Sequence, residues 1–212
     1  GTLRLIRDVT RDKELAEMFE EYAPRLLTTF GNYEPAGMRV VPVSTEIKAD
    51  LLVHRYEDIR RLIEEAKSFE VMECICRKEQ GLLGHECDRP HEVCLTFGDF
   101  GRYFHENKMG RQINTDEAFK ILDLAEESGL VLCPTNSQEI QAICCCCPCC
   151  CPGLRFAKMA PRPADFMLAP YEAQIDTDEC TNCALCIDRC QMDAIEELDD
   201  ACDIVDGRCI GC

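Results

Sequence analysis

The chain of 212 residues contains no tryptophan, and aromatic residues make up only 7% of it. Basic residues are also few, since 23 lysines and arginines stand against 40 acidic residues and leave a formal net charge of −17. Nucleic-acid binding requires a basic footprint for the phosphates, so we expect no nucleic-acid partner. No run approaches the roughly 18 apolar residues of a membrane-spanning helix, which argues against direct membrane insertion. Neither a Gly-x-Gly-x-x-Gly motif nor a Walker loop occurs, so a nucleotide cofactor would have to come from a partner.

Cysteine is what the chain has in excess, with 19 residues. Seven of the eight positions over 144–151 are cysteines, interrupted only by Pro148. A free cysteine in a core behaves as a small hydrophobic residue, but seven crowded thiols would be an oxidation hazard. Soft thiolates hold iron–sulfur clusters, zinc or copper(I). The run therefore predicts a metal site.

A secreted disulfide framework is the competing interpretation of so many cysteines. The count is odd, no signal peptide opens the chain, and adjacent cysteines cannot easily reach separate disulfide partners. We therefore expect a reducing, anaerobic cytoplasm. The start at Gly1 and the unfinished cysteine run at Cys212 also suggest a piece of a longer polypeptide.

Hydrophobic periodicity predicts three helices and two short strands. The helices are expected over 11–23, where the proline that follows would end the helix, over 56–69, and over 114–128, where Asn114 would be the N-cap and the next glycine the stop. The strands are expected over 130–132 and over 71–76. The second strand would place Cys74 and Cys76 on the same face.

These elements predict an α+β fold in several parts. We expect an N-terminal helical region over 1–70, a cysteine-rich cluster-binding domain over 71–160, a proline-rich linker over 161–173 and a ferredoxin-like module over 174–212. The order helix, strand, helix, strand is similar to a winged-helix module. Such a likeness in element order carries no function by itself.

The C-terminal cysteines follow a specific spacing. Cys180, Cys183, Cys186 and Cys190 form the pattern C-x2-C-x2-C-x3-C of bacterial ferredoxins. Three thiolates at this spacing can cap three irons of one cubane, and the fourth ligates the other cluster of a two-cluster protein. Zinc sites share the C-x2-C pair but not the whole pattern. The spacing therefore favours iron–sulfur clusters.

The segment from residue 174 resembles the bacterial two-cluster ferredoxin family, with Cys209 and Cys212 beginning a second run. The resemblance implies that Cys180, Cys183 and Cys186 hold one cluster with a cysteine beyond residue 212. It implies that Cys190, Cys209 and Cys212 hold the other with a further absent cysteine. Gln191 stands where the family has proline, which affects only how the chain turns. Cys202 matches no family ligand, so we expect a packed or free thiol.

The central cysteines are the other candidate ligands. One natural set is Cys74, Cys76, Cys87 and Cys94, since four thiolates suit one cubane or one tetrahedral zinc. In the run 144–147, alternate side chains of an extended chain face opposite sides. The run must therefore bridge two metal centres, build a larger non-cubane cluster or leave some thiols as spectators. The candidate metal ligands are Cys74, Cys76, Cys87, Cys94, Cys144, Cys145, Cys146, Cys147, Cys149, Cys150 and Cys151.

The residues around these cysteines have simpler interpretations. We expect His85 and His91 to be surface loop residues rather than ligands. Arg77, Lys78 and Arg89 are the local basic residues, which either donate hydrogen bonds to cluster sulfur or remain solvated.

The motifs at 73–78, 87–90, 94–98 and 143–155 together resemble 4Fe–4S dicluster proteins of strict anaerobes, in which a region of this kind precedes a two-cluster ferredoxin. The resemblance implies 4Fe–4S clusters as cofactors. Two would lie in the ferredoxin module if its C-terminus is completed, and one or more, cubane or non-cubane, in the central domain.

The expected function is iron–sulfur electron transfer as a subunit or adaptor of a larger anaerobic oxidoreductase. Its partners would be redox proteins, such as oxidoreductase subunits or a flavoprotein. The main alternative is a reductase whose atypical central cluster binds and reduces a substrate. A redox sensor built on the winged-helix-like part is disfavoured by the acidic charge, and metal storage would leave the ferredoxin motif unexplained.

Overall fold

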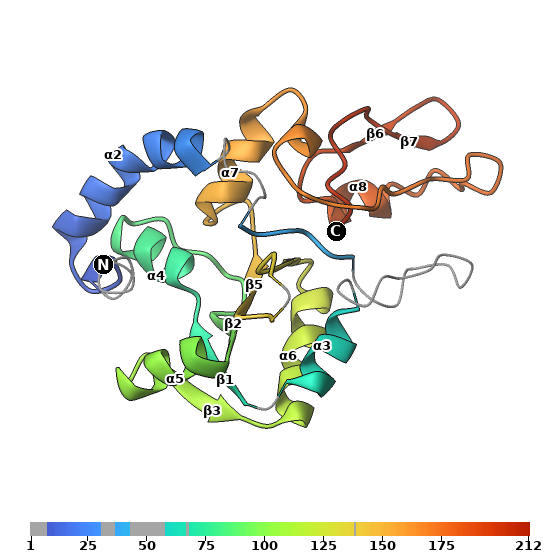
Figure 1. Cartoon of the computed structure of the whole chain (residues 1–212). Coiled ribbons are helices and arrows are strands. Elements are labelled where there is room, and N and C mark those ends of the chain that lie inside the picture. Colours follow the sequence, from blue (N-terminus) through green and yellow to red (C-terminus); the bar gives the residue numbers. More distant parts are fainter. Residues whose placement is uncertain (1–7, 31–36, 43–57, 67, 138) are drawn as a thin grey trace.

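A five-stranded antiparallel sheet lies at the centre of the molecule, with the strand order β3-β1-β2-β5-β4 (Figure 1). The computed structural model describes residues 8–30, 37–42, 58–66, 68–137 and 139–212. Helices and an antiparallel sheet share one structure, which confirms the predicted α+β class. The strands are β1 (Phe69–Glu73), β2 (Glu92–Phe97), β3 (Gly110–Ile113), β4 (Val131–Pro134) and β5 (Ala142–Cys146).

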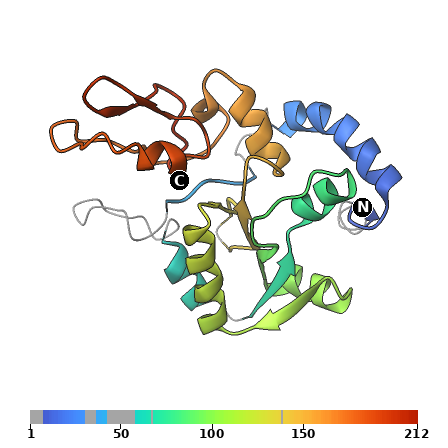
Figure 2. The ribbon, with the colours of Figure 1, turned by 180° about the vertical axis from the view of Figure 1, so that it is seen from behind.

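The helices α3 (Ile59–Glu65) and α6 (Thr115–Glu127) lie together on one side of the sheet in both views (Figures 1 and 2). Their apolar faces and the inner residues of the strands form the main hydrophobic core. The prediction for α6 is confirmed, because the Asn114 side chain accepts a hydrogen bond from the Glu117 amide over 2.9 Å. Gly129 follows the helix with a φ of +63°, a conformation that favours glycine.

Helix α2 (Lys13–Phe30) lies against α4 (Ile75–Leu82) and α7 (Pro152–Met159). Arg155 in α7 donates to the Glu20 carboxylate in α2, and the distance from Nη1 to Oε2 is 3.0 Å. The prediction that α2 ends near Pro24 is wrong, because the helix continues for six residues. Proline removes only one backbone bond, and the hydroxyls of Thr28 and Thr29 donate to the carbonyls of Pro24 and Arg25.

Two predicted boundaries near the first strand are also wrong. The helix predicted over 56–69 is α3, which ends at Glu65, and Phe69 already begins β1; residues 56, 57 and 67 lie outside the described residues. The strand predicted over 71–76 ends at Glu73, and Cys74 is the N-cap of α4. Hydrophobic periodicity did not predict helix α4, because the buried residues of this helix are polar: Arg77, Glu79 and Gln80.

The elements that are similar to a winged helix are not consecutive in the structure, because α4, β2, α5 (Gly98–Glu106) and β3 lie between β1 and α6. Helix α5 and strands β2, β3 and β5 complete a five-stranded sheet around the predicted succession of α3, β1, α6 and β4. None of the helices in the described part of the chain has the length and apolar character needed to cross a bilayer.

The ferredoxin-like segment contains helix α8 (Leu185–Arg189) and the hairpin of β6 (Ile195–Glu197) and β7 (Cys202–Ile204). The preceding segment includes the short 3-10 helix η1 (Pro163–Asp165), whose Ala164 amide donates to the Gly207 carbonyl. Figures 1 and 2 both place α7 between α2 and this segment. The domain boundaries given above stay predictions.

Candidate metal centres

The pleat of β5 divides the cysteine run into two sets of thiols. Cys145 is buried in the main core beneath the sheet, whereas Cys144 and Cys146 are half-buried and pack on a second core cluster. Successive side chains of a strand point to opposite faces, so the alternation predicted for this run is confirmed over β5. Beyond the strand, the chain turns at Pro148 and enters α7 at Pro152.

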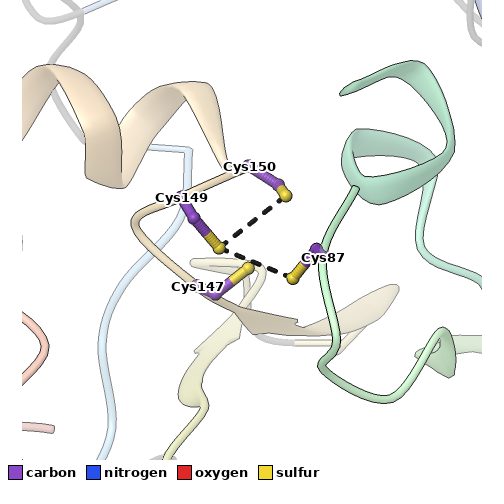
Figure 3. Close-up of side chains that lie close together, drawn as sticks. All are labelled: Cys87, Cys147, Cys149 and Cys150. Carbon is purple, nitrogen blue, oxygen red and sulfur yellow. Dashed lines mark hydrogen bonds between the residues drawn. The ribbon is translucent and has the colours of Figure 1, made fainter. Parts of the chain in front are cut away.

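Four thiols form the first compact group: Cys87, Cys147, Cys149 and Cys150 (Figure 3). Their sulfur atoms all lie within 4.8 Å of one another. The distance between sulfurs is 3.5 Å for Cys87 and Cys149, and 3.8 Å for Cys149 and Cys150. Three members come from the turn between β5 and α7, and Cys87 comes from the loop after α4. We call this set the four-thiol site.

The size of the four-thiol site limits what it can hold in this form. A tetrahedral zinc with Zn–S bonds of about 2.3 Å places its sulfurs about 3.8 Å apart, which matches the separations above. The same four thiolates satisfy the ligand count of a 4Fe–4S cubane, around which they would have to spread. The donor set therefore fits both a single soft metal ion and a cluster.

Burial and neighbouring thiols both shift the pKa values in the four-thiol site, in the same direction at Cys147 and in opposite directions at Cys87. Burial and the nearby Cys149 raise the pKa of Cys147 to about 11. Burial also raises the pKa of Cys87, but the amide of Arg89 and the thiol of Cys149 outweigh it and leave that pKa below its ordinary value. A bound cation would favour the deprotonated form of each thiol, because metal ligands are thiolates.

Six other thiols interact in a closed ring, which we call the six-thiol ring. Each lies close enough to its two neighbours to shift their pKa values. Two apolar clusters hold these thiols, one with Cys74, Cys76 and Cys94 and the other with Cys144, Cys146 and Cys151. In order around the ring they are Cys74, Cys76, Cys151, Cys146, Cys144 and Cys94. Among the residues that the structure describes, only the four-thiol site has three or more ligand atoms all within 4.8 Å. The ring is therefore more open than a site closed on one ion.

The sheet and two helix ends place the ring thiols. Leu95 pairs with Ile143 in the antiparallel ladder, so the next position along it sets Cys94 opposite Cys144. Cys74 and Cys151 are the N-cap residues of α4 and α7. Neighbouring thiols lower the pKa of Cys74 to about 2 and that of Cys151 well below its ordinary value, and backbone amides at both helix starts also favour the thiolate.

Arg77 lies between the two groups of thiols and is only 1% exposed. Its Nη1 donates to the Pro90 carbonyl over 2.8 Å, and its Nη2 donates to the Cys145 carbonyl over 3.1 Å. Burial lowers the pKa of this guanidinium, but Cys74 of the ring and Cys147 of the four-thiol site raise it above its ordinary value. Its Nε has no hydrogen-bond partner within the described structure. A buried cation with a spare donor suits anionic sulfur on either side.

The ferredoxin-like segment supplies amide donors to its own thiols. Cys180 Sγ accepts from the amides of Asn182 and Cys202, each over 3.4 Å. Cys190 Sγ accepts from the Ala194 amide over 3.3 Å. Backbone amides directed at sulfur are what a cluster-ligating thiolate requires.

Cys202 is buried, as expected for a packed thiol. Its sulfur donates to Asn182 Oδ1 over 3.5 Å. Burial and the nearby Cys186, one of the predicted ligands, raise the pKa of Cys202 to about 11. Cys202 therefore packs directly beside the first ferredoxin ligand set.

Cys133 connects the ring to the ferredoxin-like segment. It pairs with Cys144 across β4 and β5 and lies close enough to Cys146 to raise the pKa of that thiol. Cys133 also lies close enough to contribute, after burial, Cys190 and Cys209, to the raised pKa of Cys212, which is about 11. One apolar cluster around Cys133 contacts thiols of both groups: Cys144, Cys146 and Cys151 of the ring, and Cys190 and Cys209.

The structure thus regroups the predicted ligands. Cys87 joins the four-thiol site and not the set with Cys74, Cys76 and Cys94, because the chain after α4 carries it to the turn before α7. Cys145 points into the core and joins neither group. Within the described residues no metal-capable group includes His85 or His91, and both are exposed, as expected. Lys78 pairs with Glu73 and Arg89 donates to the Ser128 carbonyl, so neither is an unpaired charge.

Comparison with known proteins identifies part of the chain. The family described as "4Fe-4S binding domain" (Fer4) matches residues 173–196. No curated protein and no solved structure matches the chain. The Fer4 match and the metal-capable cysteine groups support 4Fe–4S clusters as the cofactors of this protein.

Gln191, which replaces the proline of the ferredoxins, fastens this segment to the sheet domain. Its side-chain amide donates to the Gly129 carbonyl, and Lys158 donates to its backbone carbonyl over 3.0 Å.

We expect Gln191→Pro and Gln191→Ala to keep the iron content, because neither removes a ligand. Both should weaken the packing of the C-terminal segment on the end of α6 by about 1 kcal/mol, because the side-chain hydrogen bond is lost. Faster amide exchange over 126–131 in hydrogen-exchange mass spectrometry checks this; unchanged exchange in both variants contradicts it.

Proposed function

We propose that this protein transfers electrons between ferredoxin-type iron–sulfur clusters and cysteine-bound metal centres next to the sheet, as a subunit or adaptor of a larger anaerobic oxidoreductase. The apolar cluster around Cys133, which packs against thiols of both groups, carries the proposal. Electron transfer needs closely spaced centres, and one shared apolar cluster brings the two sets of ligands together. The Fer4 match supports the ferredoxin end of this path.

The charge and composition support a protein that passes electrons to other proteins. The net charge of −17 suits docking on basic patches of redox partners, such as oxidoreductase subunits or a flavoprotein. We place the protein in the cytoplasm of an anaerobe, where crowded thiols stay reduced. Two ferredoxin-type clusters held by residues 174–212 would form the other end of this electron-transfer path.

A second candidate function follows from the dimensions of the four-thiol site. Sulfur separations of 3.5 and 3.8 Å suit a single zinc ion that stabilises the fold without taking part in redox chemistry. Electron transfer would then use only the ring and the ferredoxin clusters. Metal analysis of the four-thiol site distinguishes zinc from iron.

The function is tested with protein purified without air. We expect iron, acid-labile sulfide and EPR signals of reduced 4Fe–4S clusters in the wild type, and electron transfer from a reduced low-potential dye to an added one-electron acceptor. Cys183→Ser should lose about four irons and four sulfides, the content of one cubane, and slow the transfer at least tenfold. Cys202→Ser is the matched control, since Cys202 packs beside the ligands and should leave the iron count unchanged. Wild-type protein that contains zinc and no acid-labile sulfide would contradict the proposal.

A further inference from the structure

The six-thiol ring is the feature that the ferredoxin match does not explain. It lies outside residues 173–196 and shares no thiol with the four-thiol site. Its members come from four separate parts of the chain: the start of α4, strand β2, strand β5 and the N-cap of α7. Cys74, Cys76 and Cys94 belong to one apolar cluster and Cys144, Cys146 and Cys151 pack on another, and the register of β2 against β5 brings the two sets together at Cys94 and Cys144.

We propose that the six-thiol ring binds one iron–sulfur cluster with more than one iron, separate from the four-thiol site and from the ferredoxin clusters. This proposal rests on the proposed function and names a further cofactor site for it. Cys74, Cys76, Cys94, Cys144, Cys146 and Cys151 are the candidate ligands.

The open form of the ring indicates a polynuclear occupant. Each thiol lies near two others, but no three of them lie mutually within 4.8 Å in the described structure. A single tetrahedral ion would draw four sulfurs to about 3.8 Å from one another. Thiols spread around an open centre suit a cluster in which different thiolates bind different irons.

The surroundings of the ring suit an anion. Two eight-residue helices, α4 and α7, begin at ring residues, and helix N-termini favour thiolates. The buried Arg77 guanidinium adds a full positive charge beside Cys74, and its Nε lacks a partner within the described residues. Burying several thiolates and sulfides without such compensation would be costly.

The position of the ring favours iron–sulfur chemistry over zinc. Cys146 of the ring contacts Cys133, and the apolar cluster around Cys133 also contacts the ferredoxin thiols Cys190 and Cys209. A redox-inactive ion at this position would end the electron path at the ferredoxin clusters. A redox-active cluster there would extend it into the sheet domain.

The strand β5 offers a matched pair of variants for the test. Cys144→Ser removes a ring ligand, whereas Cys145→Ala changes the next residue, whose side chain lies in the core on the other face. We expect the full chain, purified without air, to lose more than one iron and the matching sulfide in Cys144→Ser and to lose one EPR signal. Cys145→Ala should keep the wild-type content. Cys94→Ser, on a different strand, should reproduce the loss.

The outcomes separate this proposal from the proposed function. Equal iron and sulfide in Cys144→Ser, Cys94→Ser and wild type would overturn the ring proposal while leaving the signal that depends on Cys183 in place. If the wild type shows the signal that depends on the ring cysteines but none that depends on Cys183, only the ferredoxin part of the proposed function is overturned. Where the ring variants fail to fold, native mass spectrometry of the wild-type chain decides. Iron beyond the contents lost in Cys183→Ser and Cys87→Ser supports the ring, and its absence, or zinc without sulfide, overturns it.

Discussion

Replacing Arg77 with methionine is expected to lower the reduction potentials of the centres beside the sheet and to destabilise the fold. Arg77 carries a buried positive charge next to both Cys74 and Cys147. A unit charge about 8 Å away contributes about 2 kcal/mol at an effective dielectric constant of about 20. For a one-electron couple this is about 90 mV. Reduction adds negative charge, so loss of the cation should make both potentials more negative.

The structural cost of the same change comes from two carbonyls. Arg77 donates to Pro90 and Cys145 over 2.8 and 3.1 Å, and methionine leaves both acceptors unpaired. Each buried unpaired group costs about 1–3 kcal/mol, so unfolding by denaturant should begin at markedly lower concentration. Redox titration followed by EPR measures the potentials of the variant in native conditions.

Arg77→Lys is the matched control, because it keeps the charge and loses the planar fork. It should lose stability like the methionine variant, but the reduction potentials of the centres beside the sheet should stay close to those of the wild type. The ferredoxin clusters provide an internal reference, since no interaction joins Arg77 to their thiols in the described structure. Equal shifts in all centres, or none in either variant, would contradict the assigned position of this charge.

Replacing Cys87 with serine is expected to empty the four-thiol site without disturbing the other centres. Cys87 is the one ligand that the loop after α4 contributes, and its sulfur lies 3.5 Å from that of Cys149. Serine retains the shape but is a poor ligand for soft metals. We expect loss of one zinc, or of about four irons with their sulfide if the site holds a cubane. Elemental analysis with sulfide determination measures which of the two is lost.

The controls for this change lie nearby. Cys150→Ser should give the same loss from the other side of the site. His85→Ala, two residues before Cys87 and exposed, should leave the metal content unchanged. If the histidine variant loses metal and Cys87→Ser does not, the ligand assignment is wrong.

Much of the site was predictable because its signals are local. Asn114 and Gly129 mark the ends of α6 in the sequence, and the alternation of thiols over β5 follows from strand geometry alone. The C-x2-C-x2-C-x3-C spacing likewise predicts the segment that the Fer4 family matches. These features depend on neighbouring residues and not on how distant segments meet.

The remaining features depend on tertiary contacts. Helix α4 buries polar residues such as Arg77, so no apolar periodicity marks it. The partition of Cys87 from Cys74 requires knowledge of where the loop after α4 returns to the sheet. Cys133 carried no motif, and only the register of β4 against β5 reveals that it faces Cys144. Pairing registers of this kind are set by the whole sheet.

The scattered origin of the six ring cysteines has a consequence for biosynthesis. Most of the sheet lies between Cys74 and Cys151 in the sequence, so the two thiols can meet only after β1, β2 and β5 have paired. Metal loading there must follow folding of the nascent polypeptide, since no short peptide presents the complete ligand set. The C-terminal motif, in contrast, offers three thiols within seven residues and can capture iron as soon as it leaves the ribosome.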